Sequence, residues 1–392
     1  MVSHQVTTRS KQQKIKTQFK CQFSHVTLAL GFAIAVVYFA LYQRMQTIAH
    51  GLIPTDTLQL PQQREKKTNL DVNLGCLVLL APQRTMDTWW NEITRFCLLM
   101  RAIRSIDQNL NAYFGPYPIY ILVAKDWQLD PKQRDGEYTD ADRALIQSWA
   151  PHSKVIFQEI NLYSADALEP NTDRELILKW REGFDGSVSG RDLGYTSMCR
   201  LWSGRLQQMS FILQYKYYMR MDDDSLFISK VPEDPFIKME TNQLSYLWRR
   251  DASDRWGISQ LWQICKPHIT VTPDTPFLSG ETYSGEQPYN NFHISSVAFW
   301  SSPEWTAIWN DLNEQHAFFK YRVGDANVHA IAVMLLEKHQ FMKWKDIPYR
   351  HNSNDMGVKE WAPVEWRFEC ESAQAAHNVS WAKNHGGKIE TL

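Results

Sequence analysis

The sequence predicts an α/β protein with a mixed, mostly parallel sheet flanked by helices. After residue 70, three short apolar runs of strand length are separated by helical or polar segments. A fourth run, residues 217–221, is rich in aromatic side chains and stops at three successive aspartates. Strands that alternate with helices indicate a parallel sheet, because each crossover between parallel strands needs a long connection.

The N-terminal region predicts a membrane anchor. Residues 1–25 contain five basic and no acidic side chains, and residues 26–42 are apolar apart from Thr27. Seventeen helical residues extend about 25 Å, close to the roughly 27 Å hydrocarbon core of an early-secretory membrane. We expect the basic flank in the cytosol and the rest of the chain in the lumen. The alternative, a cleaved signal peptide, is disfavoured by bulky Tyr38, Leu41 and Tyr42 at the end of the run.

Residues 43–70 are polar, contain prolines and lack periodicity, which is typical of a stem. A globular lumenal domain is then expected over 71–392. A net charge of −1 gives no reason to expect a nucleic-acid partner. The one N-glycosylation sequon begins at Asn378 in the polar C-terminal tail.

The lumenal part contains five cysteines, an odd number, so at least one is free unless it bridges two chains. Their pairing cannot be deduced from spacing. They are Cys76, Cys97, Cys199, Cys265 and Cys370.

The elements of the globular domain are predicted in chain order. Residues 74–80 are a strand candidate, and Pro82 separates them from a helical pattern over 86–106. Residues 117–124 and 154–160 are further strand candidates. From 195 to 215 apolar residues recur at three- and four-residue steps, which predicts one continuous helix leading into the strand at 217–221.

The acidic triplet Asp222-Asp223-Asp224 ends that strand. Open α/β sheets bind ligands at the carboxyl ends of their strands. In an extended segment Asp222 and Asp224 point the same way, so one or both can meet a hard divalent cation. The alternative is an acidic turn after a core strand, which an isolated triplet of aspartates more often is.

Four sequence motifs in a fixed order make the functional interpretation more specific than the acidic triplet alone. They are residues 195–204 (Tyr-Thr-Ser-Met-Cys-Arg-Leu-Trp-Ser-Gly), Tyr217-Tyr218-x-Arg220 followed by Asp234-Pro235-Phe236, Gly324-Asp325-Ala326-x-Val328-His329, and Asp346-Ile347-x-Tyr349-Arg350-His351. In this order and spacing the chain resembles glycosyltransferase family 15, the fungal-type α-1,2-mannosyltransferases of the secretory pathway. The match is convincing over about 195–352 and weaker upstream from Cys76.

The resemblance implies a GT-A fold, a single-pass type II anchor in the Golgi or ER membrane, and mannose transfer with retention of configuration. The donor would be GDP-mannose, the cofactor Mn²⁺, and the acceptor a mannosyl group on a glycoprotein or glycolipid. The family's metal-binding acid falls on Asp222, with Asp224 expected to share the ion, and its metal-ligand histidine falls on His351.

Four further matched positions are expected to bind the donor: Tyr217, Tyr218, Arg220 and Arg200. The tyrosines are equally compatible with a core role, and Arg220 with pairing to a neighbouring acid.

One segment departs from the family pattern. Residues 289–294 align with the family's Asn-Phe-Glu-Ile, so His293 stands where the family has the acid proposed to attack or stabilise the transferred sugar. One alternative is that the diphosphate leaves from the face of the sugar that the acceptor attacks, and that the diphosphate takes the proton of the acceptor. The other is that a different acid, Asp325 or Glu286, has replaced the glutamate. Asp325 is also a candidate helix N-cap. The alternatives to the mannosyltransferase are a transferase for another nucleotide sugar and a non-catalytic, lectin-like or assembly protein.

Overall fold

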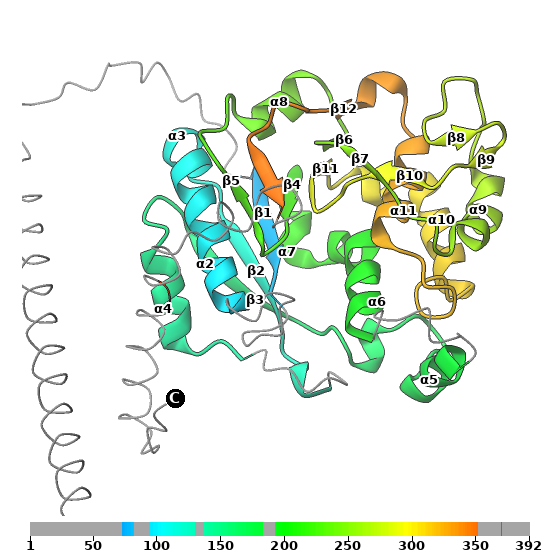
Figure 1. The fold of residues 1–392 in the computed structure, drawn as a ribbon, viewed down its shortest axis with the longest axis horizontal. Coiled ribbons are helices and arrows are strands. Elements are labelled where there is room, and N and C mark those ends of the chain that lie inside the picture. Colours follow the sequence, from blue (N-terminus) through cyan, green and yellow to red (C-terminus); the bar gives the residue numbers. More distant parts are fainter. Residues whose placement is uncertain (1–72, 82–93, 130–136, 183–192, 352–369, 371–392) are drawn as a thin grey trace, which may run out of the picture. The chain divides into compact units, whose positions relative to one another are not determined.

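A seven-stranded mixed sheet organises the molecule (Figure 1). The computed structural model describes residues 73–81, 94–129, 137–182, 193–351 and 370. The strand order is β12-β6-β11-β4-β1-β2-β3, and β11 alone in this sheet runs antiparallel to both neighbours. The prediction of a mixed, mostly parallel sheet is therefore confirmed.

The strands of the main sheet have short, mostly buried sequences. They are β1 (Gly75–Leu80), β2 (Ile119–Ala124), β3 (Val155–Ile160), β4 (Tyr217–Met221), β6 (Tyr246–Trp248), β11 (Phe292–Ser296) and β12 (Phe341–Lys343). Three two-stranded ladders pair β5 (Ser225–Phe227) with β13 (Tyr349–His351), β7 (Asp251–Ser253) with β10 (Glu286–Pro288), and β8 (Leu278–Ser279) with β9 (Thr282–Tyr283).

The helices lie on both faces of the sheet. They are α2 (Arg95–Ile106), α3 (Ala112–Phe114), α4 (Asp140–Ser148), α5 (Arg174–Glu182), α6 (Leu193–Arg200), α7 (Ser210–Leu213), α8 (Pro235–Thr241), α9 (Ile258–Cys265), α10 (Pro303–Glu314) and α11 (Asp325–Met334). In Figure 1, α2 and α4 lie on one side of the central strands, and α6 and α11 on the other.

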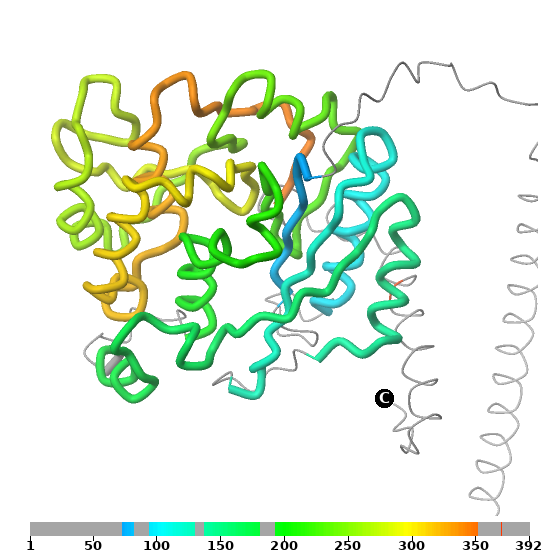
Figure 2. Tube along the Cα trace, turned by 180° about the vertical axis from the view of Figure 1, so that it is seen from behind, coloured from blue at the N-terminus to red at the C-terminus, as the bar shows by residue number. Residues whose placement is uncertain are grey.

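Alternation along each strand separates two hydrophobic cores. In β1, Cys76 and Val78 face the core that contains α6, α9, α10 and α11, whereas Leu77 and Leu79 face the core that contains α2, α4 and α8. Successive side chains of a strand point to opposite faces, so a strand buried on both faces is apolar throughout. Figure 2 shows the N-terminal part, in cyan, and the C-terminal part, in yellow and orange, on opposite sides of the central strands.

The single helix predicted over 195–215 is wrong. Helix α6 ends at Arg200, a π-helical turn follows at Leu201–Arg205 and a 3-10 turn at Leu206–Gln208, and after extended Met209 the short helix α7 begins at Ser210. Gly204 leaves the helical conformation inside the turn, where a Cβ would lie 2.6 Å from the ring of Trp309. The apolar spacing is helical along the whole segment, but tertiary packing against α10 needs a close approach that breaks it.

The N-terminal predictions lie outside the described residues. The tail at 1–25, the anchor at 26–42 and the stem at 43–70 are among them, as is Asn378. Within the described residues, none of the helices combines the length and apolarity needed to span a bilayer. The helix predicted over 86–106 is described from residue 94 onwards, and α2 occupies that part.

The cysteine count is resolved by a disulfide between Cys97 and Cys370, which joins residues 273 positions apart. Cys76, Cys199 and Cys265 are buried and form no disulfide in the described part of the chain. Three of the five cysteines after residue 70 therefore lie outside this disulfide, as the odd count requires. A disulfide is typical of proteins that fold in an oxidising compartment.

Candidate active site

A cavity of about 620 Å³ opens at the carboxyl end of β4. Acidic residues that follow β4 line one part of it, the first turn of α11 another, and residues of α6 a third. The strand ends where the predicted one does, at Met221, with the carboxylates directly after it. The cavity therefore lies at the ligand-binding edge expected for an open α/β sheet.

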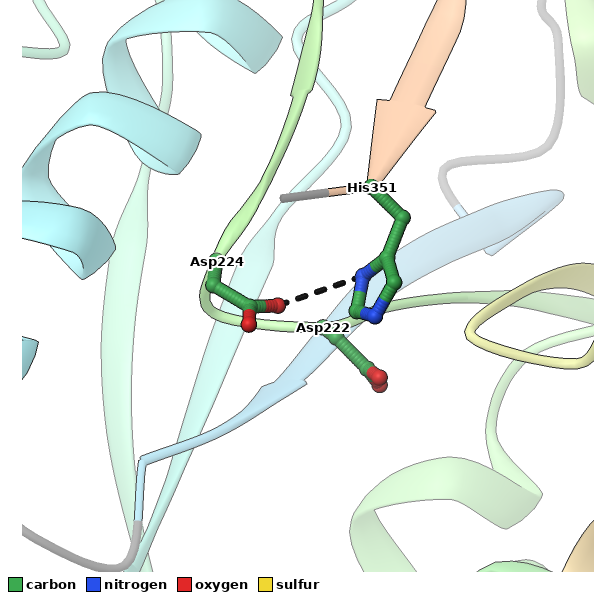
Figure 3. A group of neighbouring side chains, drawn as sticks. All are labelled: Asp222, Asp224 and His351. Atoms are coloured by element: carbon green, nitrogen blue, oxygen red, sulfur yellow. Dashed lines mark ion pairs between the residues drawn. The ribbon is translucent and has the colours of Figure 1, made fainter. Parts of the chain in front are cut away.

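Three predicted metal ligands meet in this cavity (Figure 3). One ligand atom from each of Asp222, Asp224 and His351 lies within 4.8 Å of the others. His351 Nδ1 lies 3.2 Å from an oxygen of Asp224. The sequence correctly predicted that these residues lie together, although His351 comes from far along the chain.

The reason for their proximity differs from the prediction. Asp223 and Asp224 form a turn rather than an extension of the strand, and the Ser225 N–H donates to the Asp222 carbonyl at 3.1 Å. After the turn, β5 pairs antiparallel with β13, and Ser225 lies opposite His351 in the register. The Ser225 hydroxyl oxygen is also 2.9 Å from His351 Nδ1. The short ladder thus fixes the histidine beside the acids.

The donor set fits a divalent transition metal. Ligands on opposite sides of one hard cation are separated by about 4–5 Å, so one ion can reach all three atoms after small adjustments. A ligand set of two carboxylates and one imidazole suits Mn²⁺ better than Mg²⁺, because Mg²⁺ prefers oxygen ligands only. Burial raises the pKa of Asp222, and the charges of Arg220 and His351 partly offset this effect.

Arg95, which no motif indicated, holds the middle acid of the triplet. Its guanidinium donates to Asp223 at 2.7 Å and lies 3.7 Å from Asp224. Burial raises the pKa of Asp223, although Arg95 opposes the shift. Asp223 is thus turned toward α2 and leaves the other two carboxylates to face His351.

A buried ion pair adjoins the acidic cluster. Arg220, 3% exposed, donates to Asp325 at 2.5 Å and to Asp222 at 3.1 Å, and its guanidinium lies 4.4 Å from the Trp202 ring centroid. Asn290 donates a further hydrogen bond to Asp325 at 3.0 Å. Burial disfavours ionisation of Asp325, but the Arg220 charge and these hydrogen bonds outweigh it and hold its pKa below the ordinary value. Asp325 is therefore an ionised carboxylate in the cavity lining.

The interpretation of Asp325 as a helix N-cap is wrong. Gly324 occupies the N-cap position of α11 without a side-chain hydrogen bond, and Asp325 is the first helical residue. Its carboxylate accepts from Arg220 and Asn290, across the cavity wall, instead of from the backbone of its own helix.

The structure does not place His293 in contact with the cavity. The residue is fully buried and is absent from the cavity lining. Its Nδ1 lies 3.1 Å from the Asn290 carbonyl and its Nε2 lies 3.1 Å from the Tyr218 hydroxyl. Its ring stacks on Tyr246 at 5.3 Å. Burial holds the pKa of His293 well below its usual range, so it stays neutral. The expectation that His293 contacts the transferred sugar rested only on its alignment with the family's glutamate, and the structure does not support it.

Four other predicted site residues also lie away from the cavity lining. The Tyr217 hydroxyl donates to Glu240 at 3.0 Å, and the Tyr218 hydroxyl accepts from Gln207 at 2.6 Å, so both tyrosines satisfy their hydroxyls within the protein. The Arg200 guanidinium donates to Asn313 and to the Ala167 carbonyl. Glu286 is exposed at the start of β10.

Nothing in the sequence pattern indicated the amides of the cavity. Gln287, Asn291 and Asn327 line it, as does Tyr289. Asn291 lies within residues 289–294, two positions before His293. No property of an isolated amide in a sequence distinguishes a ligand contact from a turn or cap.

Comparison with known proteins gives the family. A family model described as glycolipid 2-alpha-mannosyltransferase matches residues 89–386, more than half of the chain. O-glycoside alpha-1,2-mannosyltransferase omh1 of Schizosaccharomyces pombe is 31% identical over 169 residues, which cover 40% of this chain and 43% of that protein. The probable mannosyltransferase KTR3 of Saccharomyces cerevisiae is 28% identical over 325 residues, or 79% of this chain and 74% of that protein.

The matched segments cover only between 41% and 48% of four of the curated relatives. Among solved structures, core-mannan synthase A (CmsA/Ktr4) from Aspergillus fumigatus, in its Mn/GDP form, superposes with a TM-score of 0.58 at 20% identity, covering 73% of this chain and 76% of that chain. At this identity the likeness shows the fold, and the predicted GT-A-type glycosyltransferase fold is confirmed. By the family match, the chain belongs to the glycolipid 2-alpha-mannosyltransferase family, glycosyltransferase family 15.

Proposed function

We propose that the protein is a metal-dependent mannosyltransferase that moves mannose from GDP-mannose to a mannosyl acceptor on a glycoprotein or glycolipid, in α-1,2 linkage and with retention. The observation that carries the proposal is the cluster of Asp222, Asp224 and His351 in a cavity at the carboxyl edge of the sheet. Family membership and the Mn and GDP named for the similar structure from Aspergillus fumigatus support it.

The three clustered side chains would hold Mn²⁺. When bound, the ion neutralises charge on the diphosphate and makes it a better leaving group. Within this cavity the described chain offers Asp325 as the ionised carboxylate that can stabilise positive charge on the transferred sugar, because Arg220 and Asn290 keep it deprotonated and oriented. This role replaces the one that sequence comparison gave to His293. The departing diphosphate then takes the proton of the acceptor hydroxyl.

A nucleotide-sugar panel tests the proposal. We expect the purified full chain to transfer mannose from GDP-mannose to an oligomannose acceptor with Mn²⁺ present, and to lose the activity with a chelator. UDP-sugars and other GDP-sugars are the competing donors, and Asp325→Asn is the inactive control. Preference for another donor would change the substrate. Absence of transfer and of donor hydrolysis with every nucleotide sugar would favour the non-catalytic alternative.

We further propose that residues 26–42 anchor the enzyme in a Golgi or ER membrane with the globular domain in the lumen. The basic flank, the apolar run and the disulfide between Cys97 and Cys370 support this topology. In sealed microsomes the globular domain should resist added protease until detergent is present. Digestion of the domain without detergent would contradict the topology, and a mature N-terminus after residue 42 would contradict the anchor.

A further inference from the structure

Unpaired amide groups gather in the cavity beside the acidic cluster. Among the described residues, four buried Asn or Gln side chains have a polar atom without a hydrogen-bond partner, and three of them line this cavity. The three, which we call the amide cluster, are Gln287, Asn291 and Asn327; the fourth is Gln207. Buried polar groups in native proteins are nearly always hydrogen-bonded, so a concentration of exceptions in one cavity needs an explanation.

Asn291 is the most informative member. The residue is 5% exposed, and neither its side-chain oxygen nor its side-chain nitrogen has a hydrogen-bond partner. Exchanging the two atoms by turning the amide over would therefore leave it unpaired. Its backbone is fixed beside the acidic cluster, because its carbonyl accepts from the Asp222 N–H at 3.1 Å and from the Tyr349 hydroxyl at 3.0 Å. The unpaired amide is therefore held next to the site proposed for the metal.

The other two members come from neighbouring elements. Gln287, 6% exposed, lies on β10, and its Oε1 is unpaired. Asn327 is fully buried in the first turn of α11, two residues after Asp325, with Nδ2 unpaired and Oδ1 accepting from the Tyr283 hydroxyl at 2.5 Å. Buried Asn111 and Asn313, outside the cavity, use both their oxygen and their nitrogen.

The unpaired atoms select the chemistry of the ligand. The oxygens of Gln287 and Asn291 need a donor, and the nitrogens of Asn291 and Asn327 need an acceptor. The non-bridging oxygens of an ionised diphosphate only accept, so they leave the two amide oxygens unsatisfied. A hydroxyl group both donates and accepts, and a sugar carries several at short spacing.

We propose that Gln287, Asn291 and Asn327 form the subsite that binds the hydroxyl groups of a hexose in this cavity. The inference rests on the proposed function and deepens it, because it names the residues that discriminate the sugar from the nucleotide. The hexose is either the sugar carried by the donor or the terminal mannose of the acceptor. Both present the same hydroxyl chemistry, and the experiment separates them.

The test compares two binding affinities and one KM in four proteins. These are the full chain, Asn291→Ala, Gln287→Ala and the exposed control Asn310→Ala. Calorimetry measures binding of GDP and of GDP-mannose, each with Mn²⁺, and initial rates give KM for methyl α-mannoside as acceptor. Each cavity variant should keep its GDP affinity within about twofold and lose about five- to tenfold in either the GDP-mannose affinity or the acceptor KM. The first loss assigns the subsite to the donor sugar, and the second to the acceptor.

Thermal stability separates a ligand contact from a structural one. Because the Asn291 amide has no partner in the protein, Asn291→Ala should leave the Tm of the ligand-free chain unchanged or raise it. Removing a structural hydrogen-bonding amide would lower the Tm instead. Monodeoxy analogues of GDP-mannose give a second readout, since the hydroxyl that Asn291 binds should matter to the wild type and not to the variant.

Several results would overturn the inference. Parallel losses of GDP and GDP-mannose affinity would assign the amides to the nucleotide, and unchanged values in both sugar measurements would remove any role in sugar binding. A wild-type chain that binds GDP with Mn²⁺ but gains nothing from any hexose would also overturn it. A wild-type chain that does not bind GDP refutes the proposed donor; binding of methyl α-mannoside that is lost in Asn291→Ala would still support the subsite.

Discussion

Asp222→Ala and His351→Ala should each abolish manganese-dependent binding of GDP. Each removes one of the three clustered ligand atoms, and even partners that only orient a metal ligand cost about 10–100-fold in affinity when removed. A direct ligand should cost at least as much. Because His351 lines a cavity rather than fills a core, the Tm of His351→Ala without metal should change little. Asp222→Ala should lower the Tm, because it removes one of the two carboxylates that pair with buried Arg220.

Titration of GDP with and without Mn²⁺ measures this effect, and thermal shift gives an independent readout. Wild-type protein should gain Tm on adding Mn²⁺ and GDP, because a ligand that binds only the folded state stabilises it. The variants should show no gain. Asp140→Asn, at an exposed position in the first turn of α4, is the control and should keep the full response. Unchanged metal-dependent binding in both ligand variants would remove the metal assignment.

Arg220→Met should both destabilise the protein and inactivate it. The substitution leaves Asp325 buried, and Asp222 partly buried, without the cation that they share. Removing one partner of a buried ion pair costs about 3–5 kcal/mol, since an uncompensated charge stays buried. The activity should fall by at least about a hundredfold, because the Asp325 carboxylate loses both its charge partner and its orientation.

Chemical denaturation and initial rates measure the two effects, and a second substitution separates them. Asp325→Asn in the Arg220→Met background removes one unpaired charge, so the double variant should recover part of the stability but no activity. Arg220→Lys keeps the charge without the planar guanidinium and should fall between wild type and Arg220→Met in stability. If Arg220→Met is as stable as wild type, or if the two substitutions act additively, the ion pair does not hold the site together.

Local sequence determined the strands and the position of the acids. The apolar runs that became β1, β2 and β4 are buried on both faces, which makes them recognisable without knowing their partners. The carboxylates after β4 lie at the sheet edge because the chain leaves the sheet there. Four ordered motifs added His351 to Asp222 and Asp224 through resemblance to a family, which no local property of that histidine would have done.

Where the residues that contact a position lie far along the chain, the tertiary structure decided its conformation and its exposure to the cavity. Helical spacing over 195–215 gave no sign of the break at Gly204, because the ring that requires it belongs to Trp309. For the same reason, His293 is buried away from the cavity and Asp325 lies in its lining. Strand alternation and packing against Tyr246 bury the histidine, while Arg220 and Asn290 hold the aspartate at the cavity.

The sequence by itself therefore determined four strands of the sheet, the acidic edge and the family, since these depend on periodicity and on ordered motifs. The tertiary structure alone decided which side chains face the cavity and which of them lack partners. Burial and hydrogen bonding are properties of pairs of residues brought together from distant segments, as the ladder that places His351 beside Asp224 shows.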